Sequence, residues 1–160
     1  MRCLALVLAL VIVAGVAHGA EWGAIRPGES TQQAVRAQFG QATKVTSQKV
    51  DGYDSAQWLY EGEQAPRGIA RVTIDFGILT PQGYKPEIVR VMVLHPKPGT
   101  FTRADVLAGW GEPQGIRTDG GGPAVFYQSG LVVTFDKEGW LATSMTFTPP
   151  QKLPEGPAPR

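Results

Sequence analysis

The chain has 160 residues, of which 42% are hydrophobic, a formal net charge of +1 and a single cysteine. Its 15 basic and 14 acidic side chains are interspersed, and no basic stripe could neutralise a run of phosphates, so nucleic acid is not the expected ligand. The length allows one domain or two small halves with a packed core.

The first twenty residues, MRCLALVLALVIVAGVAHGA, have the layout of a secretory signal peptide. Arg2 precedes an apolar run, and residues 17–19 offer a cleavage site before Ala20, although cleavage after Ala20 fits as well. The run is shorter than the about 20 residues that span a bilayer, so an uncleaved anchor is the less favoured alternative. We therefore expect a periplasmic or secreted protein that has no membrane span after cleavage.

The position of the single cysteine limits which cysteine-dependent functions the exported chain could have. Cleavage would remove Cys3, and with it every disulfide, thiol nucleophile or cysteine metal ligand. A bacterial lipoprotein carries its acylated cysteine at the end of the apolar run, whereas Cys3 stands at its start. We expect no lipid anchor.

Two stretches of the chain are similar, STQQAVRAQFGQAT at residues 30–43 and FTRADVLAGWGEPQ at residues 101–114. Each predicts a capped helix of about nine residues, with Thr31 or Thr102 as the N-cap. Asp105 stands three residues after Thr102, where it can complete a capping box. Helices this short are marginal alone and must dock an apolar face on other elements.

The segments that follow each helix read as strands, because their apolar and polar residues alternate with period two. A longer Pro- and Gly-rich stretch, GILTPQGYKP at residues 77–86, is predicted to be a loop insertion. The predicted strands are 43–50, 57–61, 69–76 and 87–95 after the first helix, and 124–128, 131–136 and 140–147 after the second.

The predicted fold class is α+β, with two tandem repeats of one helix and three or four antiparallel strands packed together; whether their strands join in one continuous sheet is left open. The predicted organisation is a signal peptide at 1–20, repeats at 21–95 and 96–148, and a Pro-rich disordered tail at 149–160. Two independent units are disfavoured because residues 96–98, Pro-Lys-Pro, leave almost no linker.

The second repeat carries a residue pattern that the first repeat shares in part. Its residues are Gly99, Thr102, Asp105, Val106, Trp110, Gly111, Pro113, Phe126, Tyr127 and VTFDKEG at 133–139. This pattern resembles the SmpA/OmlA domain of the outer-membrane assembly lipoprotein BamE, and its duplication is similar to the tandem repeat of the secreted β-lactamase inhibitory proteins. The chain lacks the lipidated cysteine of the former and the disulfides of the latter.

The resemblance implies a non-enzymatic, extracytoplasmic protein that binds other proteins. It would be an envelope accessory or outer-membrane assembly protein. The alternative is a secreted inhibitor of an enzyme such as a β-lactamase or a protease, for which the 77–86 loop with Tyr84 is the candidate inserting segment. A small-molecule-binding protein or hydrolase is a third hypothesis, but no convergent polar groups are visible in the sequence to support it.

Residues that could carry catalysis or hold a cofactor are isolated in the sequence. His95 is the only histidine beyond the signal peptide, and no base or acid partner is nominated for it. Asp51 and Asp54 lack the spacing of a calcium loop, and DGGGP at residues 119–123 lacks the Lys-Ser/Thr of a phosphate loop. We expect no enzyme activity, no cofactor and no metal.

Aromatic and arginine side chains are the predicted partner-binding residues, because these residue types are enriched in interface hot spots. The hypothesis places them on the sheet face opposite the helices, whereas the alternative places the aromatic ones in the core. The predicted residues are Trp58, Tyr60, Arg71, Tyr84, Arg90, Tyr127 and Trp140.

Overall fold

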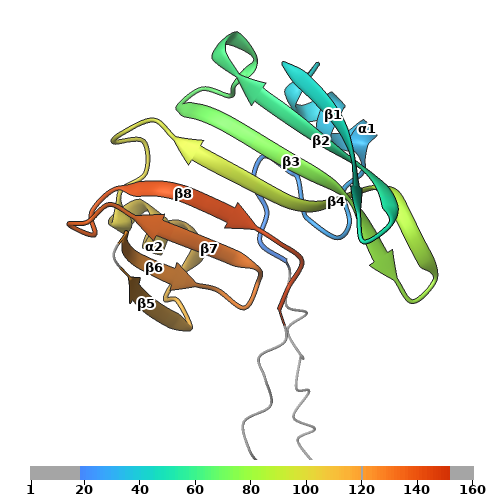
Figure 1. Cartoon of the computed structure of the whole chain (residues 1–160). Coiled ribbons are helices and arrows are strands. Elements are labelled where there is room, and N and C mark those ends of the chain that lie inside the picture. The colour runs from blue at the N-terminus through green and yellow to red at the C-terminus, as the bar shows by residue number, and fades with distance from the viewer. Residues whose placement is uncertain (1–18, 120, 152–160) are drawn as a thin grey trace, which may run out of the picture.

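The computed structural model describes residues 19–119 and 121–151, and Figure 1 shows the arrangement of their helices and strands. Most of the predicted signal peptide and residues 152–160 of the predicted tail lie outside this part of the chain. The elements are α1 (Gln32–Phe39), β1 (Lys44–Val50), β2 (Tyr53–Glu61), the 3-10 turn η1 (Gly62–Gln64), β3 (Ile69–Thr80), β4 (Gly83–Pro96), α2 (Arg103–Trp110), β5 (Gly115–Asp119), β6 (Gly122–Phe126), β7 (Leu131–Phe135) and β8 (Ala142–Phe147).

All eight strands belong to one antiparallel sheet with the order β1-β2-β3-β4-β8-β7-β6-β5. The first four strands form one meander, the last four form another, and the two meet where β4 pairs with β8. This junction is short, because only Met92, Val93 and Leu94 have partners on β8. The sheet therefore continues from one meander into the next without a break.

The predicted fold class is wrong. The described part of the chain is not an α+β fold of two helix-plus-sheet repeats, because its strands form one continuous eight-stranded sheet and only two α-helices, of eight residues each, accompany that sheet among the described residues. Pairing of β4 with β8 satisfies the backbone groups of two strand edges that separate units would leave open. The protein is predominantly β, with one sheet that spans both of the predicted repeats.

Two details of the strand prediction also differ from the structure. Residues 77–86 do not form a loop, since β3 runs on to Thr80 and β4 begins at Gly83, which leaves a two-residue turn. The strand β5 was not expected, because GIRTD has a single large apolar residue, Ile116, and no clear alternation.

The caps predicted for both helices are confirmed. The Thr31 hydroxyl accepts a hydrogen bond from the Ala34 N–H at 3.2 Å, and the Thr102 hydroxyl accepts one from the Asp105 N–H at 3.2 Å. The Asp105 carboxylate in turn accepts the Thr102 N–H at 2.8 Å, which completes the capping box. Gly111, like its counterpart in α1, ends its helix with a φ of 77°.

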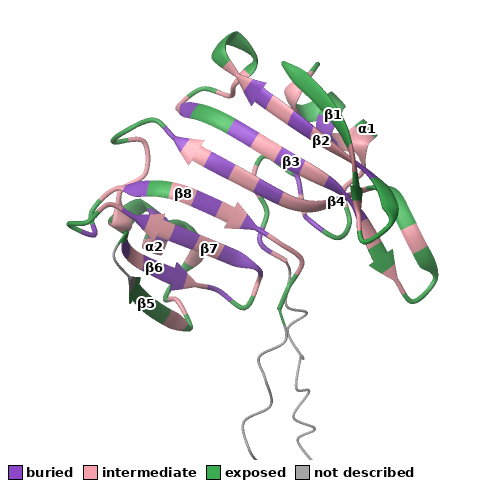
Figure 2. Cartoon of the chain, in the orientation of Figure 1, coloured by how far each residue is buried: buried purple, intermediate pink, exposed green. Residues whose placement is uncertain are grey.

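One hydrophobic core lies between the sheet and the two helices. Val35 of α1 and Val106 of α2 are fully buried, and each helix docks through this residue. Figure 2 shows that buried and partly exposed residues alternate along the strands, as expected for a sheet with one face on a core. The largest fully buried side chains include Tyr60, Phe76, Phe135, Phe147, Ile74, Met92, Leu94, Leu131 and Met145.

The N-terminal segment is part of this core. Ala20, which falls in the predicted signal peptide, is 4% exposed, and its N–H donates to the Ser129 carbonyl at 2.7 Å. Ile25 is also buried. Among the residues that the structure describes, no helix is both long and apolar enough to cross a bilayer.

Candidate functional site

Three of the predicted binding residues lie in the core. Trp58, Tyr60 and Tyr127 are 5%, 0% and 6% exposed, on the side of the sheet that the helices cover. The hypothesis that they project from the opposite face is wrong, because the more apolar set of each strand faces the core.

These buried aromatics hold the helices on the sheet. The Tyr60 hydroxyl donates to the Gly40 carbonyl at 3.3 Å, and the Tyr127 hydroxyl donates to the Gly111 carbonyl at 3.0 Å, so each tyrosine bonds the end of one helix. The Arg36 guanidinium lies 5.3 Å from the centroid of the Trp58 ring. Burial raises the pKa of both tyrosines, because desolvation disfavours the phenolate.

The other predicted residues are accessible but are not gathered at one place. Arg71 is exposed on β3, with its Nε 3.7 Å from the Glu61 carboxylate. Trp140 is 69% exposed beside the turn between β7 and β8. Arg90 is partly exposed at a β-bulge of β4, and its Nε atom is buried without a hydrogen-bond partner.

Tyr84 belongs to an aromatic pair where two hairpins approach each other. Its ring stacks on Tyr53 with centroids 4.5 Å apart, and its hydroxyl donates to the Asp54 carbonyl at 2.7 Å. Gly77 makes this possible, because a Cβ there would overlap the Tyr84 hydroxyl. Leu79, opposite Tyr84 on the hairpin, is 65% exposed.

The face of the sheet without helices carries a row of uncharged side chains. Figure 1 shows both helices behind the sheet, so the face turned to the viewer has none. Direct cross-strand neighbours in the register define a row, which we name the open-face row, and each of its side chains is partly exposed. The row crosses six adjacent strands through Leu59, Thr73, Val93, Thr146, Val132 and Phe126.

Ionisable side chains lie around this row rather than in it. The next cross-strand neighbours on one side are Glu61, Arg71 and His95, and Asp75 lies on the other side, where it accepts a hydrogen bond from the Gln57 amide at 2.8 Å. The charged neighbours therefore lie beside β2, β3 and β4. At the β6 end of the row, the Arg117 guanidinium lies 5.4 Å from the centroid of the Phe126 ring. The predicted set of Trp, Tyr and Arg residues does not include this row, because the row consists mostly of Thr, Val and Leu. Period-two alternation places Leu59 on the strand face opposite Trp58 and Tyr60, and this is the sequence signal that points to the row.

The side chains that could bind a metal ion are dispersed over the described part of the chain. Within residues 19–119 and 121–151, no three His, Cys, Asp or Glu side chains are close enough to hold a metal ion. Asp51 forms the turn between β1 and β2 with a φ of 52°, and Asp54 pairs with Lys49 at 2.8 Å. These aspartates therefore have structural roles in a hairpin, Asp51 in its turn and Asp54 in an ion pair.

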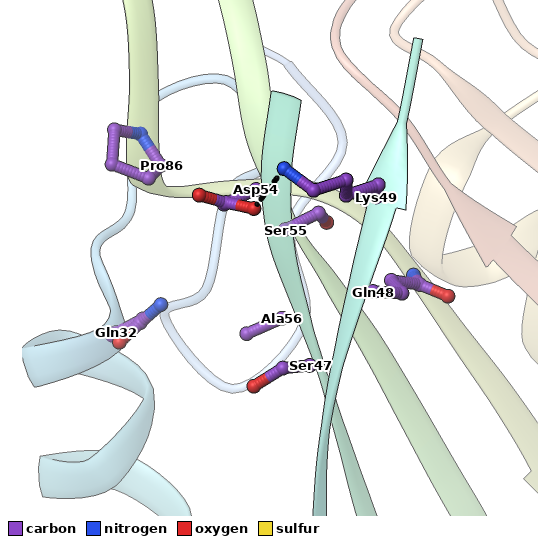
Figure 3. A pocket seen from close by; sticks show the side chains of 8 residues that line it. All are labelled: Gln32, Ser47, Gln48, Lys49, Asp54, Ser55, Ala56 and Pro86. Carbon is purple, nitrogen blue, oxygen red and sulfur yellow. Dashed lines mark ion pairs between the residues drawn. The ribbon is translucent and has the colours of Figure 1, made fainter. Parts of the chain in front are cut away.

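An open groove lies beside the β1–β2 hairpin, and Figure 3 shows its lining. It measures about 570 Å³. Its polar groups are two glutamine amides, two serine hydroxyls and the Lys49–Asp54 ion pair, and the Ser55 hydroxyl donates to the Phe76 carbonyl. The lining residues are Gln32, Ser47, Gln48, Lys49, Asp54, Ser55, Ala56 and Pro86.

The chain matches no protein-family model, no curated protein and no solved structure. The resemblance to the SmpA/OmlA domain therefore stays a prediction from the residue pattern. The functional proposal below is therefore based on the surface of the described residues.

Proposed function

We propose that this protein is an exported, non-enzymatic protein-binding module that contacts its partner through the helix-free face of the sheet. The observation that carries the proposal is the open-face row, a strip of uncharged side chains across six strands, with charged side chains beside its β2–β4 part and Arg117 at its β6 end. The solvated face of an antiparallel sheet is ordinarily polar. Depletion of charge at the centre with a polar rim is the anatomy of a protein interface.

The ionisable groups support a binding role over catalysis. Where a pKa is shifted, the cause is structural. Helix capping by the Thr102 hydroxyl and N–H lowers the pKa of Asp105, the Asp54 carboxylate raises the pKa of Lys49, and burial raises the pKa of Tyr60 and Tyr127. Catalytic groups are typically shifted by a charge partner within a cleft. Of these groups, Lys49 has a charge partner in the groove, and Asp54 raises its pKa, which keeps the ammonium protonated instead of preparing it as a base or nucleophile.

Export to the periplasm or medium is proposed from the signal-peptide layout of the sequence. Because Ala20 is buried and bonded to Ser129, cleavage before Ala20 keeps its contacts, whereas cleavage after it removes a core residue. N-terminal sequencing of the exported protein is expected to start at Ala20. A start at Glu21 or at Met1 would contradict this cleavage position.

An inhibitor of a secreted hydrolase, such as a β-lactamase or a protease, is the second candidate. It is favoured by the β3–β4 hairpin, whose exposed Leu79 could enter a partner's cleft. Replacing Leu79 with aspartate separates the two proposals. An inhibitor that uses the hairpin loses inhibition of its enzyme, whereas a partner bound by the open face is retained.

The test is site-specific photo-crosslinking in the native cell envelope. A crosslinker at position 73 or 146, at the centre of the row, is expected to capture the same protein. The same crosslinker at Ala37, exposed on α1 on the other side of the sheet, is the matched control. Thr73→Arg should abolish capture from position 146 while Ala37→Arg leaves it intact. Equal capture from Ala37, or none from the row, would refute the proposal.

A further inference from the structure

The strand β1 is one end of the sheet, and its outer edge has no strand partner among the described residues. Its seven residues pair with β2 in unbroken register, without a bulge. Five of the seven, Lys44–Ser47 and Lys49, are exposed, and Val45 is 57% exposed. This edge is a regular ladder of backbone donors and acceptors open to another strand.

Natural sheets protect such edges with proline, bulges or charge, and β1 has only charge. Lys49 is ion-paired with Asp54 at 2.8 Å, so one of its two lysines is already neutralised within the chain. The remaining protection is the Lys44 ammonium. The partner for this edge must therefore be a strand that avoids placing a cation opposite a lysine.

We propose that a second copy of this chain pairs with β1 through its own β1, antiparallel about a two-fold axis at Ser47. The two sheets would then continue as one. The sequence KVTSQKV is suited to this register. When the strand is paired with its own reversed copy, each charged residue lies opposite an apolar residue and each uncharged polar residue lies opposite another. Ser47 would face Ser47, Thr46 would face Gln48, and each lysine would face a valine.

Cross-strand neighbours explain why this register is favourable. Lys44 of one copy lies opposite Val50 of the other, and Lys49 lies opposite Val45, so no two lysines are directly opposed. Asp54, on the neighbouring strand β2, holds the Lys49 ammonium on the side away from the added strand, so Val45 of the other copy meets the Cβ end of the Lys49 side chain and not its charge. A two-fold axis at Ser47 is also the only one that uses all seven residues of the strand.

The opposite edge of the sheet does not offer the same fit. A two-fold pairing that used all five residues of β5 would place Arg117 directly opposite its own copy, and like charges directly opposed destabilise a strand pair. Self-pairing is therefore expected at β1 and not at β5. Because a seven-residue edge is a small contact, the dimer should be reversible and concentration-dependent.

Sedimentation velocity of the full chain over a range of concentrations tests the dimer. Ser47→Lys would oppose two ammonium groups at the axis and is expected to weaken dimerisation by about tenfold or more. Ser47→Thr keeps the hydroxyl without the charge and should keep the dimer, as should Thr118→Lys on β5. A wild-type chain that stays monomeric at every concentration, or a Ser47→Lys dimer of unchanged strength, would overturn the proposal.

Disulfide trapping tests the register itself. In a Cys3→Ser background, Ser47→Cys places two thiols opposite each other, with Cα atoms about 4.5–5.5 Å apart, within the range that a disulfide spans. Thr46→Cys separates its two Cα atoms by about 8 Å because of the two-residue offset, and should not crosslink. Crosslinking of both variants, or of neither, would refute the axis at Ser47.

Discussion

Replacement of Tyr60 by alanine is the sharpest test of where the aromatic residues lie. Tyr60 is 0% exposed, and its ring packs against Phe39 with centroids 5.6 Å apart. Trp140 is larger and comes from the same predicted set of binding residues, yet it is 69% exposed. If the fold is as described, the smaller side chain should matter far more to stability than the larger one.

The magnitudes follow from burial. Truncating a fully buried aromatic ring to alanine costs about 3–5 kcal/mol, because transfer and cavity terms add. At about 4 °C per kcal/mol for a chain of this size, Tyr60→Ala should lower Tm by about 12–20 °C. Trp140→Ala should change stability by no more than about 0.5 kcal/mol. Tyr60→Phe keeps the ring and loses only the hydrogen bond to Gly40, so its cost should be about 0.5–1.5 kcal/mol.

Urea denaturation with circular dichroism measures all three variants on one scale. The expected order of stability is wild type close to Trp140→Ala, then Tyr60→Phe, then Tyr60→Ala. If Tyr60→Ala unfolded at the same urea concentration as Trp140→Ala, Tyr60 would not be in the core. A Trp140→Ala variant as unstable as Tyr60→Ala would show instead that the tryptophan is covered.

Three further changes test other parts of the structure. Burial raises the pKa of Tyr60 and Tyr127, so these tyrosines ionise at lower pH in the unfolded state than in the folded one. The free energy of unfolding should be unaffected by them below about pH 10 and should fall as pH rises through the folded pKa values. Replacing both tyrosines by phenylalanine should reduce this alkaline loss, measured by urea denaturation. Hydrogen bonds from the N-cap threonine lower the pKa of Asp105 in the folded state. The Asp105 carboxylate therefore contributes stability above its unfolded pKa of about 3.9, and this contribution is lost as pH falls through the folded pKa. Asp105→Asn should make the free energy of unfolding less dependent on pH in acid. Gly77→Ala would displace Tyr84 and strain a φ of +96°, and should cost about 1–3 kcal/mol with loss of the tyrosine near-ultraviolet signal.

Local structure was predictable where a few neighbouring residues determine it. The two helices, their threonine caps and the capping box at Asp105 follow from residues no more than four positions apart, and the structure has them all. The Pro and Gly residues of 77–86 signal turns and predict a loop, whereas the structure has a hairpin there. Tyr84 of this hairpin stacks on Tyr53, a contact across 31 sequence positions that no local pattern encodes.

The predicted fold class is wrong because the pairing of distant strands is not visible in the local sequence. Each predicted repeat contained plausible strands, but which edges would meet depends on backbone groups that every sequence shares. The junction needs only three pairs, Met92 with Phe147, Val93 with Thr146 and Leu94 with Met145, and nothing in these residues marks them as partners. A sheet of eight strands and two separate smaller sheets have almost the same residue pattern, and edge pairing decides between them.

The candidate site also depends partly on local residue pattern, which the sequence shows, and partly on strand register, which it does not. Period two correctly grouped Trp58 with Tyr60 on one strand face, but alternation alone does not say which face meets the core. The more apolar set of residues on each strand faces the core. Trp58 and Tyr60, the residue types that favour a binding interface, are therefore buried in the core and are not available to a partner. What remains on the other face are residues such as Thr73 and Val93, none of which would be chosen by type. They become a candidate surface only when register aligns them across six strands, which is why the crosslinking test is aimed at positions rather than at residue types.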